Sequence, residues 1–359
     1  MANTRLNPGL DRTDDTNVGA IQTRSFSVGR IAGIDVARGL AIIGMFVAHA
    51  IPRADEAELL VDGRSSILFA TLAGISLGIM TGSERPIERG QRADRVVSIV
   101  GRALILFLLG VALGTLGSGV AIILEYYAIM FLFLTPALFL PRWALGLIAA
   151  VLTVIAPTSA AGTGSASLPV DSLAYFLQYY LLIGSYPVLI WLPFLLLGLI
   201  AARSGLGRAR TQIWMIVAGI SMSVLGYGTA WLLPGVTAEA HSGSTAEVLG
   251  SGGLAVAIIG ALLWFTSPER TGISPAIRTV LGPVGTIGAM ALTVYTMQII
   301  TLAVFVVLRE RSGGMIEYPG WPLLIGMTVA SLLFAGVWRH FLGKGPLERL
   351  LTLMTRPRK

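Results

Sequence analysis

The sequence predicts an all-α integral membrane protein with about ten transmembrane helices and both termini in the cytoplasm. Of its 359 residues, 54% are hydrophobic and only 13% are charged, whereas soluble globular domains carry about 25% charged residues. The apolar residues also gather in long uncharged runs, and the mean hydropathy is +0.77. A run of about 20 apolar residues is long enough to cross a bilayer as a helix.

Such runs recur along the whole chain after residues 1–30, a polar stretch that we interpret as a disordered cytoplasmic tail. The candidate spans are residues 31–50, 64–81, 96–116, 119–140, 143–160, 184–202, 212–233, 252–267, 280–308 and 321–342. The stretch at 170–183 is an extra interfacial or re-entrant candidate, so eleven spans are an alternative. Residues 161–183 and 234–251, rich in Gly, Ser, Thr and Ala, are interpreted as long outer loops.

The distribution of basic residues predicts the orientation. Of the 26 lysines and arginines, Arg38 lies inside the first span, and with a cytoplasmic N-terminus only four fall on the outer side: Arg53, Arg64, Arg309 and Arg311. Basic residues collect in cytoplasmic loops, so this bias favours two cytoplasmic termini and an even number of spans. It also explains the net charge of +7 without nucleic acid as a partner. We therefore expect a multi-pass protein of the inner (plasma) membrane, with the lipid bilayer around it.

The chain ends in a second cytoplasmic segment. Pro346 suits a first helical position, and four apolar residues follow at a spacing that puts them on one face: Leu347, Leu350, Leu351 and Met354. We therefore divide the chain into a tail at 1–30, a polytopic domain at 31–343 and a basic amphipathic tail at 344–359.

The first span contains three ionisable residues, Asp35, Arg38 and His49. Each costs roughly 2.5–3.5 kcal/mol at membrane depth, so such residues rarely persist without a partner or a function. At about 100° per residue all three share one helix face, and Arg38 and His49 lie about 16 Å apart along the axis. A polar stripe therefore runs most of the way through the membrane.

His49 is the leading catalytic candidate, because a neutral imidazole can take a proton from a hydroxyl near pH 7. The alternative is a solvated histidine at the membrane interface. Arg38 and Asp35 can pair at i and i+3, either as a structural ion pair or as part of the site, and a guanidinium also binds phosphate well.

The remaining candidates lie on other spans. Glu125 interrupts the fourth span at a depth similar to His49, where it could orient the imidazole, bind a substrate hydroxyl, or pair with an arginine. Arg102 lies just inside the third span and could hold an anionic cofactor. The candidate substrate-binding residues are Arg64, Tyr126, Tyr186, Trp191, Tyr295 and Gln298, although an aromatic belt explains Tyr and Trp at a span's edge equally well.

Composition excludes several chemistries. There is no cysteine, which removes disulfides, thiol nucleophiles and thiolate metal sites. The only histidines are His49, His241 and His340, too few for a histidine-rich metal centre, and we expect no metal. Neither a Walker lysine loop nor a Gly-x-Gly-x-x-Gly motif after a strand occurs.

Several segments, taken in order, resemble the polytopic transmembrane acyltransferases, which include the YeiB-like bacterial membrane proteins and the catalytic part of heparan-alpha-glucosaminide N-acetyltransferase. The segments are 30–41 (RIAGIDVARGLA), 62–69 (DGRSSILF), 72–76 (LAGIS), 186–200 (from Tyr-Pro to Gly-Leu-Ile), 288–295 (GAMALTVY) and 338–348 (WRHFLGKGPLE). The spacing from Arg38 to His49 is also similar to a signature of bacterial membrane O-acyltransferases of the acyltransferase-three type, in which the histidine is the presumed base.

The resemblance implies an acyl-CoA donor, such as acetyl-CoA, on the cytoplasmic side and an acceptor hydroxyl or amine outside, with His49 as the presumed base. We therefore predict an acyltransferase whose acceptor is an envelope glycan or lipid-linked sugar. In this hypothesis His49 deprotonates the acceptor or briefly carries the acyl group. Arg38 and Arg102 bind the donor, Asp35 positions Arg38, and Glu125 orients His49 or the acceptor. One departure is that residues 50–64 contain no histidine, where the lysosomal enzyme has its proposed catalytic one.

Two other readings of the same residues stay open. Asp35, Arg38 and Glu125 could line the pathway of a transporter or exporter, or the ion pair could serve only to lock helices in a structural or regulatory protein. The sequence leaves the oligomeric state open, a homodimer included.

Overall fold

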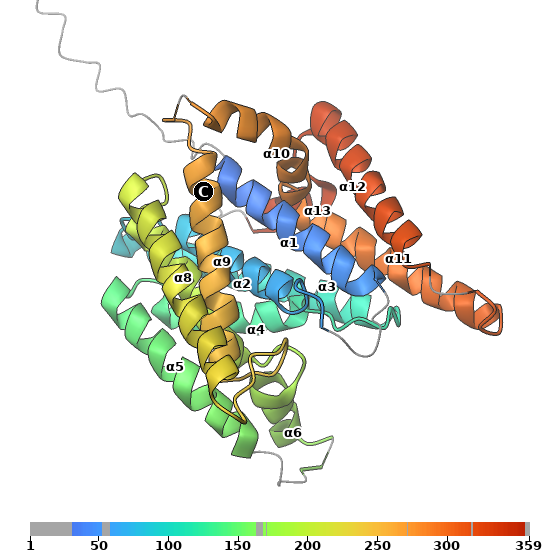
Figure 1. Cartoon of the computed structure of the whole chain (residues 1–359), viewed down its shortest axis with the longest axis horizontal. Coiled ribbons are helices and arrows are strands. Elements are labelled where there is room, and N and C mark those ends of the chain that lie inside the picture. The colour runs from blue at the N-terminus through green and yellow to red at the C-terminus, as the bar shows by residue number, and fades with distance from the viewer. Residues whose placement is uncertain are drawn as a thin grey trace, which may run out of the picture. The chain divides into compact units, whose positions relative to one another are not determined.

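The computed structural model describes residues 31–51, 58–162, 168–169, 171–270, 272–316 and 319–355. The predicted tail at 1–30 and the last four residues lie outside this part. The described chain is helical and contains no strand (Figure 1). Its helices are α1 (Ala32–Ala50), α2 (Arg64–Met80), α3 (Arg89–Gly114), α4 (Leu124–Leu134), η1 (Thr135–Ala137), α5 (Arg142–Gly162), α6 (Leu173–Gln178), η3 (Tyr179–Ile183), α7 (Val188–Ser204), α8 (Ala209–Leu232), α9 (Thr245–Phe265), α10 (Ser274–Gly288), α11 (Ala291–Arg311), α12 (Trp321–Leu342) and α13 (Pro346–Met354).

Seven of these helices are long and apolar enough to cross a membrane: α1, α3, α5, α8, α9, α11 and α12. An eighth span results if α6–η3 and α7 are taken together, although they are bent by 47° at residues 184–187. The helices α2 and α4–η1 are apolar but shorter. The predicted class, an all-α protein with many membrane helices, is confirmed for the described residues.

One predicted span was wrong. Residues 280–308 form parts of two helices, because the chain leaves helical geometry at Met290 (φ −125°, ψ 34°) between α10 and α11. The sequence Ala-Met-Ala at this point contains no helix breaker. Tertiary contacts account for the break: the Glu348 carboxylate of α13 accepts hydrogen bonds from the backbone N–H groups of Leu292 (2.8 Å) and Thr293 (3.1 Å). It thereby caps the new N-terminus of α11.

Two further boundaries differ. The predicted sixteen-residue span at 252–267 begins earlier, at Thr245, because Ser244 caps α9 by accepting from the Glu247 N–H. The outer loop after α8 is correspondingly shorter than 234–251. Residues 119–123 precede the helix in the predicted span 119–140, and α4 begins at Leu124.

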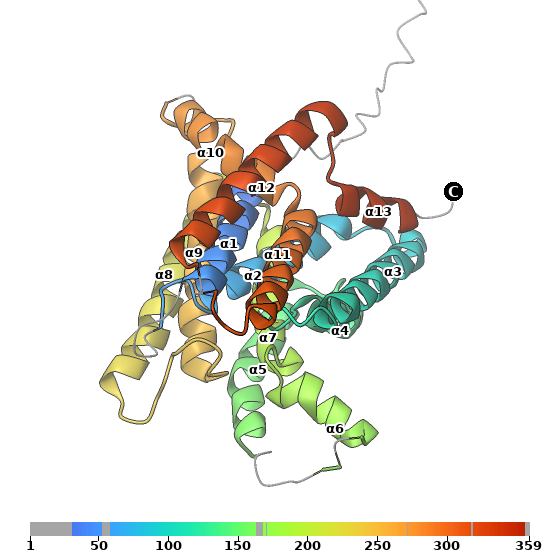
Figure 2. The same ribbon diagram turned by 90° about the vertical axis from the view of Figure 1, so that its right-hand side faces the viewer.

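The helices approach one another closely at glycines. A Cβ at Gly74 of α2 would overlap the backbone of Leu195 in α7, and a Cβ at Gly288 of α10 would overlap the Asp35 carbonyl oxygen of α1. Small residues are the usual means of close packing between membrane helices. These contacts fix α2 against α7 and α10 against α1 (Figure 2).

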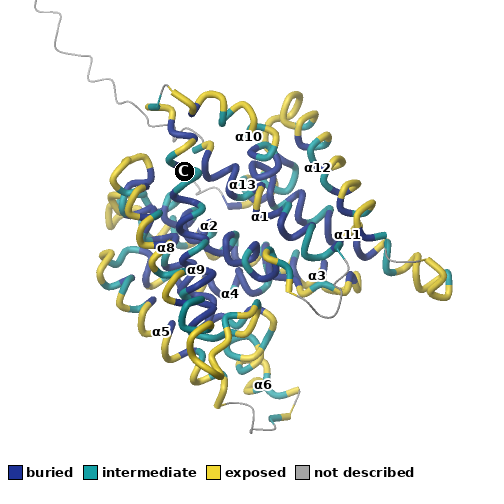
Figure 3. The backbone as a smooth tube through the Cα atoms, in the orientation of Figure 1, coloured by how far each residue is buried: buried dark blue, intermediate teal, exposed yellow. Residues whose placement is uncertain are grey.

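Burial follows the same arrangement (Figure 3). Buried residues dominate α1, α2 and α7, whereas the outer faces of α5, α8 and α12 expose large apolar side chains such as Trp214, Trp231 and Leu333. Apolar surface on the outside of long helices is expected where lipid is the solvent.

Arg203, at the end of α7, is buried and holds several segments together. Its guanidinium donates to the carbonyl oxygen of Leu138 (2.8 Å) and to Thr81 Oγ1 (2.7 Å), and also to the carbonyl oxygen of Ser83. The distribution of basic residues puts Arg203 on the predicted cytoplasmic side, and in the structure it joins the end of α2, the loop after η1 and α7.

Candidate functional site

A polar cavity of about 470 Å³ lies at the His49 end of α1. We call it the His49 cavity. Residues from α1, the segment before α2, the start of α2, Tyr186 and the loop before α9 line it. Its hydrogen-bonding side chains are His49, Glu58, Asp62, Ser65, Ser66, Tyr186, Glu239 and His241. A cavity of this size with convergent polar groups is the usual form of a small-molecule site.

The imidazole of His49 is held by a residue from the other end of the sequence. Gln298 of α11 donates from its amide nitrogen to the Met45 carbonyl oxygen (3.3 Å), and the same nitrogen lies 2.9 Å from Nδ1 of His49. An amide nitrogen only donates, so Nδ1 accepts and a neutral imidazole carries its proton on Nε2. Gln298 is 2% exposed, which fixes the position of this contact.

Carboxylates form the second wall, and one arginine lies beside them. Asp62 is buried and accepts from the Leu59 N–H (2.9 Å), and Arg64 forms an ion pair with Glu58. Arg64 also donates from Nε to Tyr227 Oη (2.9 Å). The Arg64 predicted to bind substrate is therefore engaged with Glu58 and Tyr227, at the edge of the His49 cavity.

The loop between α8 and α9 supplies a second histidine. His241 has a left-handed backbone (φ 61°), which is uncommon for a residue other than glycine and is often found at functional sites. The buried Glu247 carboxylate holds this turn by accepting from the backbone N–H groups of His241 and Gly243 (2.7 Å each). In addition, the Ala240 N–H donates to Glu58 (3.2 Å), which ties the loop to the segment before α2.

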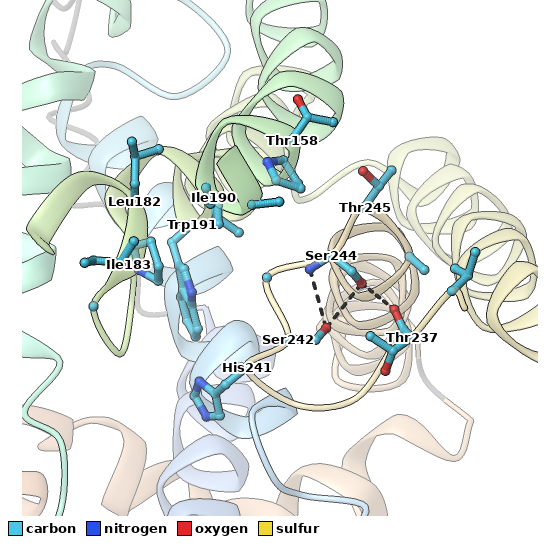
Figure 4. A pocket seen from close by; sticks show the side chains of 18 of the residues that line it. Thr158, Leu182, Ile183, Ile190, Trp191, Thr237, His241, Ser242, Ser244 and Thr245 are labelled. Atoms are coloured by element: carbon cyan, nitrogen blue, oxygen red, sulfur yellow. Dashed lines mark hydrogen bonds between the residues drawn. The ribbon is translucent and has the colours of Figure 1, made fainter. Parts of the chain in front are cut away.

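Aromatic rings surround His241. Its ring lies stacked at 6.0 Å from Trp191 and edge-on at 5.4 Å from Tyr186, measured between centroids. Figure 4 shows the His241 and Trp191 side chains adjacent at one end of a neighbouring cavity. Of the predicted substrate-binding residues, Tyr186 lines the His49 cavity together with His241, a histidine that the sequence does not single out, whereas Trp191 lines the neighbouring cavity.

The other end of α1 carries a separate basic site. Arg38 donates to Asp35 (3.2 Å), as the i, i+3 spacing predicts, and to Ser76 Oγ of α2 (2.8 Å). The charge of Arg102 on α3 is close enough to repel that of Arg38. Among the described residues, the buried Nε of Arg102 has no hydrogen-bond partner. The guanidinium groups of Arg38 and Arg102 therefore lie in one region, beside the carboxylate of Asp35.

The remaining candidates lie apart from the lining of the His49 cavity. Glu125, at the start of α4, is hydrogen-bonded to Tyr180 of η3. Tyr126 packs among the rings of Tyr179, Tyr180 and Tyr186. Tyr295 of α11 is buried, and its hydroxyl accepts from the Ile123 N–H (3.4 Å). The residue that contacts Nδ1 of His49 is Gln298, whereas the sequence analysis offered Glu125 for that role.

Nothing in the sequence singles out His241, Glu239 and Glu247 as members or supports of the site. A histidine in a loop of small polar residues was the available signal for His241, but nothing local links that loop to His49. In the described part of the chain, no three His, Asp or Glu side chains gather in a way that could hold a metal ion.

Residues 199–357, less than half of the chain, match a family described as "Protein of unknown function (DUF418)". The match covers the end of α7 and α8–α13, and so includes His241 and Gln298 but neither His49 nor Arg38. No curated protein matches the sequence.

Proposed function

We propose that the protein is a membrane-embedded acyltransferase that moves an acetyl or other small acyl group from cytoplasmic acyl-CoA to a hydroxyl of a cell-envelope glycan. The observation that carries the proposal is the pair of sites on α1. The basic site at Arg38 lies near one end of the helix, and the cavity with His49 lies at the other.

The basic site suits the donor. Arg38 and Arg102 repel each other, and Arg38 is paired with Asp35. A phosphate group would relieve that repulsion and supply acceptors for guanidinium N–H groups, which bind phosphate in well-defined geometry. We therefore assign Arg38 and Arg102 to the nucleotide part of acyl-CoA, with Asp35 and Ser76 orienting Arg38.

The His49 cavity suits the acceptor. The acceptor hydroxyl oxygen attacks the thioester carbonyl carbon while His49 takes the hydroxyl proton at Nε2. For this step the imidazole carries its own proton on Nδ1, and the Gln298 amide turns so that its oxygen, which has no hydrogen-bond partner among the described residues, accepts from Nδ1–H. The carbon–sulfur bond breaks to release coenzyme A, whose sulfur is then protonated. The carboxylates of Asp62, Glu58 and Glu239 accept hydrogen bonds from the acceptor's other hydroxyls. Arg38 and His49 are about 16 Å apart along the axis of α1. The long pantetheine arm of the donor would bridge this distance.

The proposed topology has ten spans. It counts the seven long helices, the bent α6–α7 pair as one span, and the two shorter apolar helices α2 and α4–η1. An even number keeps both termini in the cytoplasm, in agreement with the arginine bias. The His49 cavity then opens on the outer side of the inner membrane.

The decisive test is acetyl-CoA binding and turnover by the purified protein, wild type beside His49→Ala. Binding with slow thioester hydrolysis that is lost in His49→Ala, at unchanged abundance and thermal stability, is the expected result. Retained hydrolysis in the variant removes His49 from the mechanism. Failure of the folded wild type to bind acetyl-CoA at any accessible concentration contradicts the proposal as a whole.

A transporter is the second candidate, and one structural observation favours it. The chain is interrupted between α10 and α11 and again between η3 and α7, and interrupted helices line substrate sites in many transporters. Uptake of a glycan into proteoliposomes driven by a proton gradient, with no acetyl-CoA hydrolysis, would establish this alternative.

A further inference from the structure

A second cavity of about 620 Å³ adjoins the His49 cavity. It lies between the end of α5, the η3–α7 junction and the loop before α9, and we call it the apolar cavity. Figure 4 shows Leu182, Ile183, Ile190 and Trp191 along one wall. The hydroxyls on the facing wall bond within the loop: Ser242 Oγ donates to Ser244 Oγ (3.2 Å), and Ser244 Oγ donates to the Thr237 carbonyl. The lining of the apolar cavity that remains available to a ligand therefore consists mainly of carbon atoms.

The rim of the apolar cavity is exposed and hydrophobic. Ile183 is 45% exposed and Val236 is 36% exposed, and on the adjacent outer face of α5 Ile155 is 55% exposed. Because α5 is long and apolar enough to span a membrane, this face meets hydrocarbon in a bilayer. A hydrocarbon chain can thus reach the cavity from the lipid without crossing water.

His241 lines both cavities and so lies at the boundary between them. On one side of its ring lie carbon walls, and on the other lie the carboxylates and hydroxyls of the His49 cavity. Each volume falls within the roughly 300–1,000 Å³ of small-molecule sites. Such a pair of compartments fits one molecule with an apolar chain and a polar head.

Charge determines the kind of head group. Glu58, Asp62 and Glu239 contribute carboxylates to the His49 cavity. Arg64 neutralises Glu58 by pairing with it, so among the described groups the carboxylates of Asp62 and Glu239 give the cavity its negative charge. Carboxylates accept hydrogen bonds from hydroxyls, but they repel a phosphate. A neutral, hydroxylated head is favoured over an anionic one.

We propose that the two cavities together bind a neutral glycolipid-like amphiphile, with its hydroxylated head in the His49 cavity and its hydrocarbon chain in the apolar cavity. The proposal rests on the proposed function only in making this amphiphile the acyl acceptor. Binding itself requires no acyl donor, so the two proposals can fail separately.

The test uses the full chain in lipid nanodiscs and a dodecyl glucoside that carries a photoreactive diazirine near the end of its chain. We expect mass spectrometry to find crosslinks in residues 182–191 and 234–246. Unlabelled dodecyl glucoside should compete, whereas dodecyl phosphate and free glucose should not. If dodecyl phosphate competes as well as dodecyl glucoside, the choice of a neutral head group is overturned. If free glucose by itself competes, the two-compartment site is overturned.

Two variants and one control sharpen the result. Val236→Trp changes an exposed rim residue and narrows the entrance, so crosslinking should fall at least fivefold. Glu239→Arg reverses a charge of the His49 cavity, so dodecyl phosphate should begin to compete. Val337→Trp alters an apolar surface groove on α12 lined by Leu333, Phe334 and Phe341, and should leave crosslinking unchanged.

Unaltered crosslinking in Val236→Trp, or crosslinks concentrated on α12 at the same yield, would show general lipid adhesion and overturn the proposal. Acyl transfer to a soluble sugar without crosslinking would overturn this inference while leaving the acyltransferase proposal intact. Specific crosslinking without any acetyl-CoA turnover would support the two-cavity site and contradict the acyltransferase proposal.

Discussion

At the scale of single residues, the contact between Gln298 and His49 has a chemical consequence. The amide nitrogen of Gln298 faces both Met45 O and His49 Nδ1, which leaves the neutral imidazole protonated on Nε2. A base that receives a proton at Nε2 needs the opposite tautomer. In serine proteases, an amide in place of the carboxylate at Nδ1 lowers kcat by roughly 10⁴ for this reason.

Gln298→Glu therefore tests the proposed role of His49. If His49 is the base, a carboxylate at this position holds the proton on Nδ1 and frees Nε2, so the rate of acyl transfer should rise and its pH profile should shift. Gln298→Leu removes the contact and should lower kcat on the order of tenfold or more. An equal loss in both variants, with thermal stability retained, would indicate that His49 works through an Nε2–H donor instead.

At the scale of helices, Glu348 connects the C-terminal helix to the interruption between α10 and α11. Its carboxylate accepts from two backbone N–H groups and from Thr293 Oγ1 (2.6 Å). Further along the chain, Ser98 of α3 donates to the Thr355 carbonyl (2.7 Å), so α13 is packed against the bundle as well as lying at its surface (Figure 2).

Glu348→Ala should lower the stability of the folded protein by about 1–2 kcal/mol, because the first N–H groups of α11 lose their cap and the helix dipole loses a neighbouring charge. Thermal unfolding in detergent measures the change as a lower Tm. Glu310→Ala, an exposed position at the other end of α11, is the matched control and should leave Tm unchanged. The same Tm for both variants would contradict the capping role.

At the scale of the whole molecule, orientation is the property to test, and the absence of cysteine makes it simple. Single cysteines at Thr237, in the loop beside the His49 cavity, and at Ala209, at the start of α8, are both at exposed positions. A membrane-impermeant maleimide should label Thr237→Cys in intact cells, and Ala209→Cys only after permeabilisation. The reverse pattern would place the termini outside and the His49 cavity in the cytoplasm.

The sequence by itself determined the membrane class, most helix positions and the polar face of α1. These features are local: a span needs a run of apolar residues, and Asp35 and Arg38 meet because three residues bring them to one helix face. Hydropathy alone misses two boundaries for different reasons. The cap at Ser244 is local, since Glu247 follows three residues later, but it lies outside the apolar run. The break at Met290 depends on the distant Glu348.

Only the tertiary structure decided what surrounds His49. Gln298 lies 249 positions away in sequence, and His241 arrives on a loop whose conformation is held by Glu247. The break before α11 likewise depends on Glu348, 56 residues beyond Leu292. In each case packed helices bring together hydrogen-bond partners that are far apart in the chain, and hydrophobic periodicity describes the helices without their neighbours.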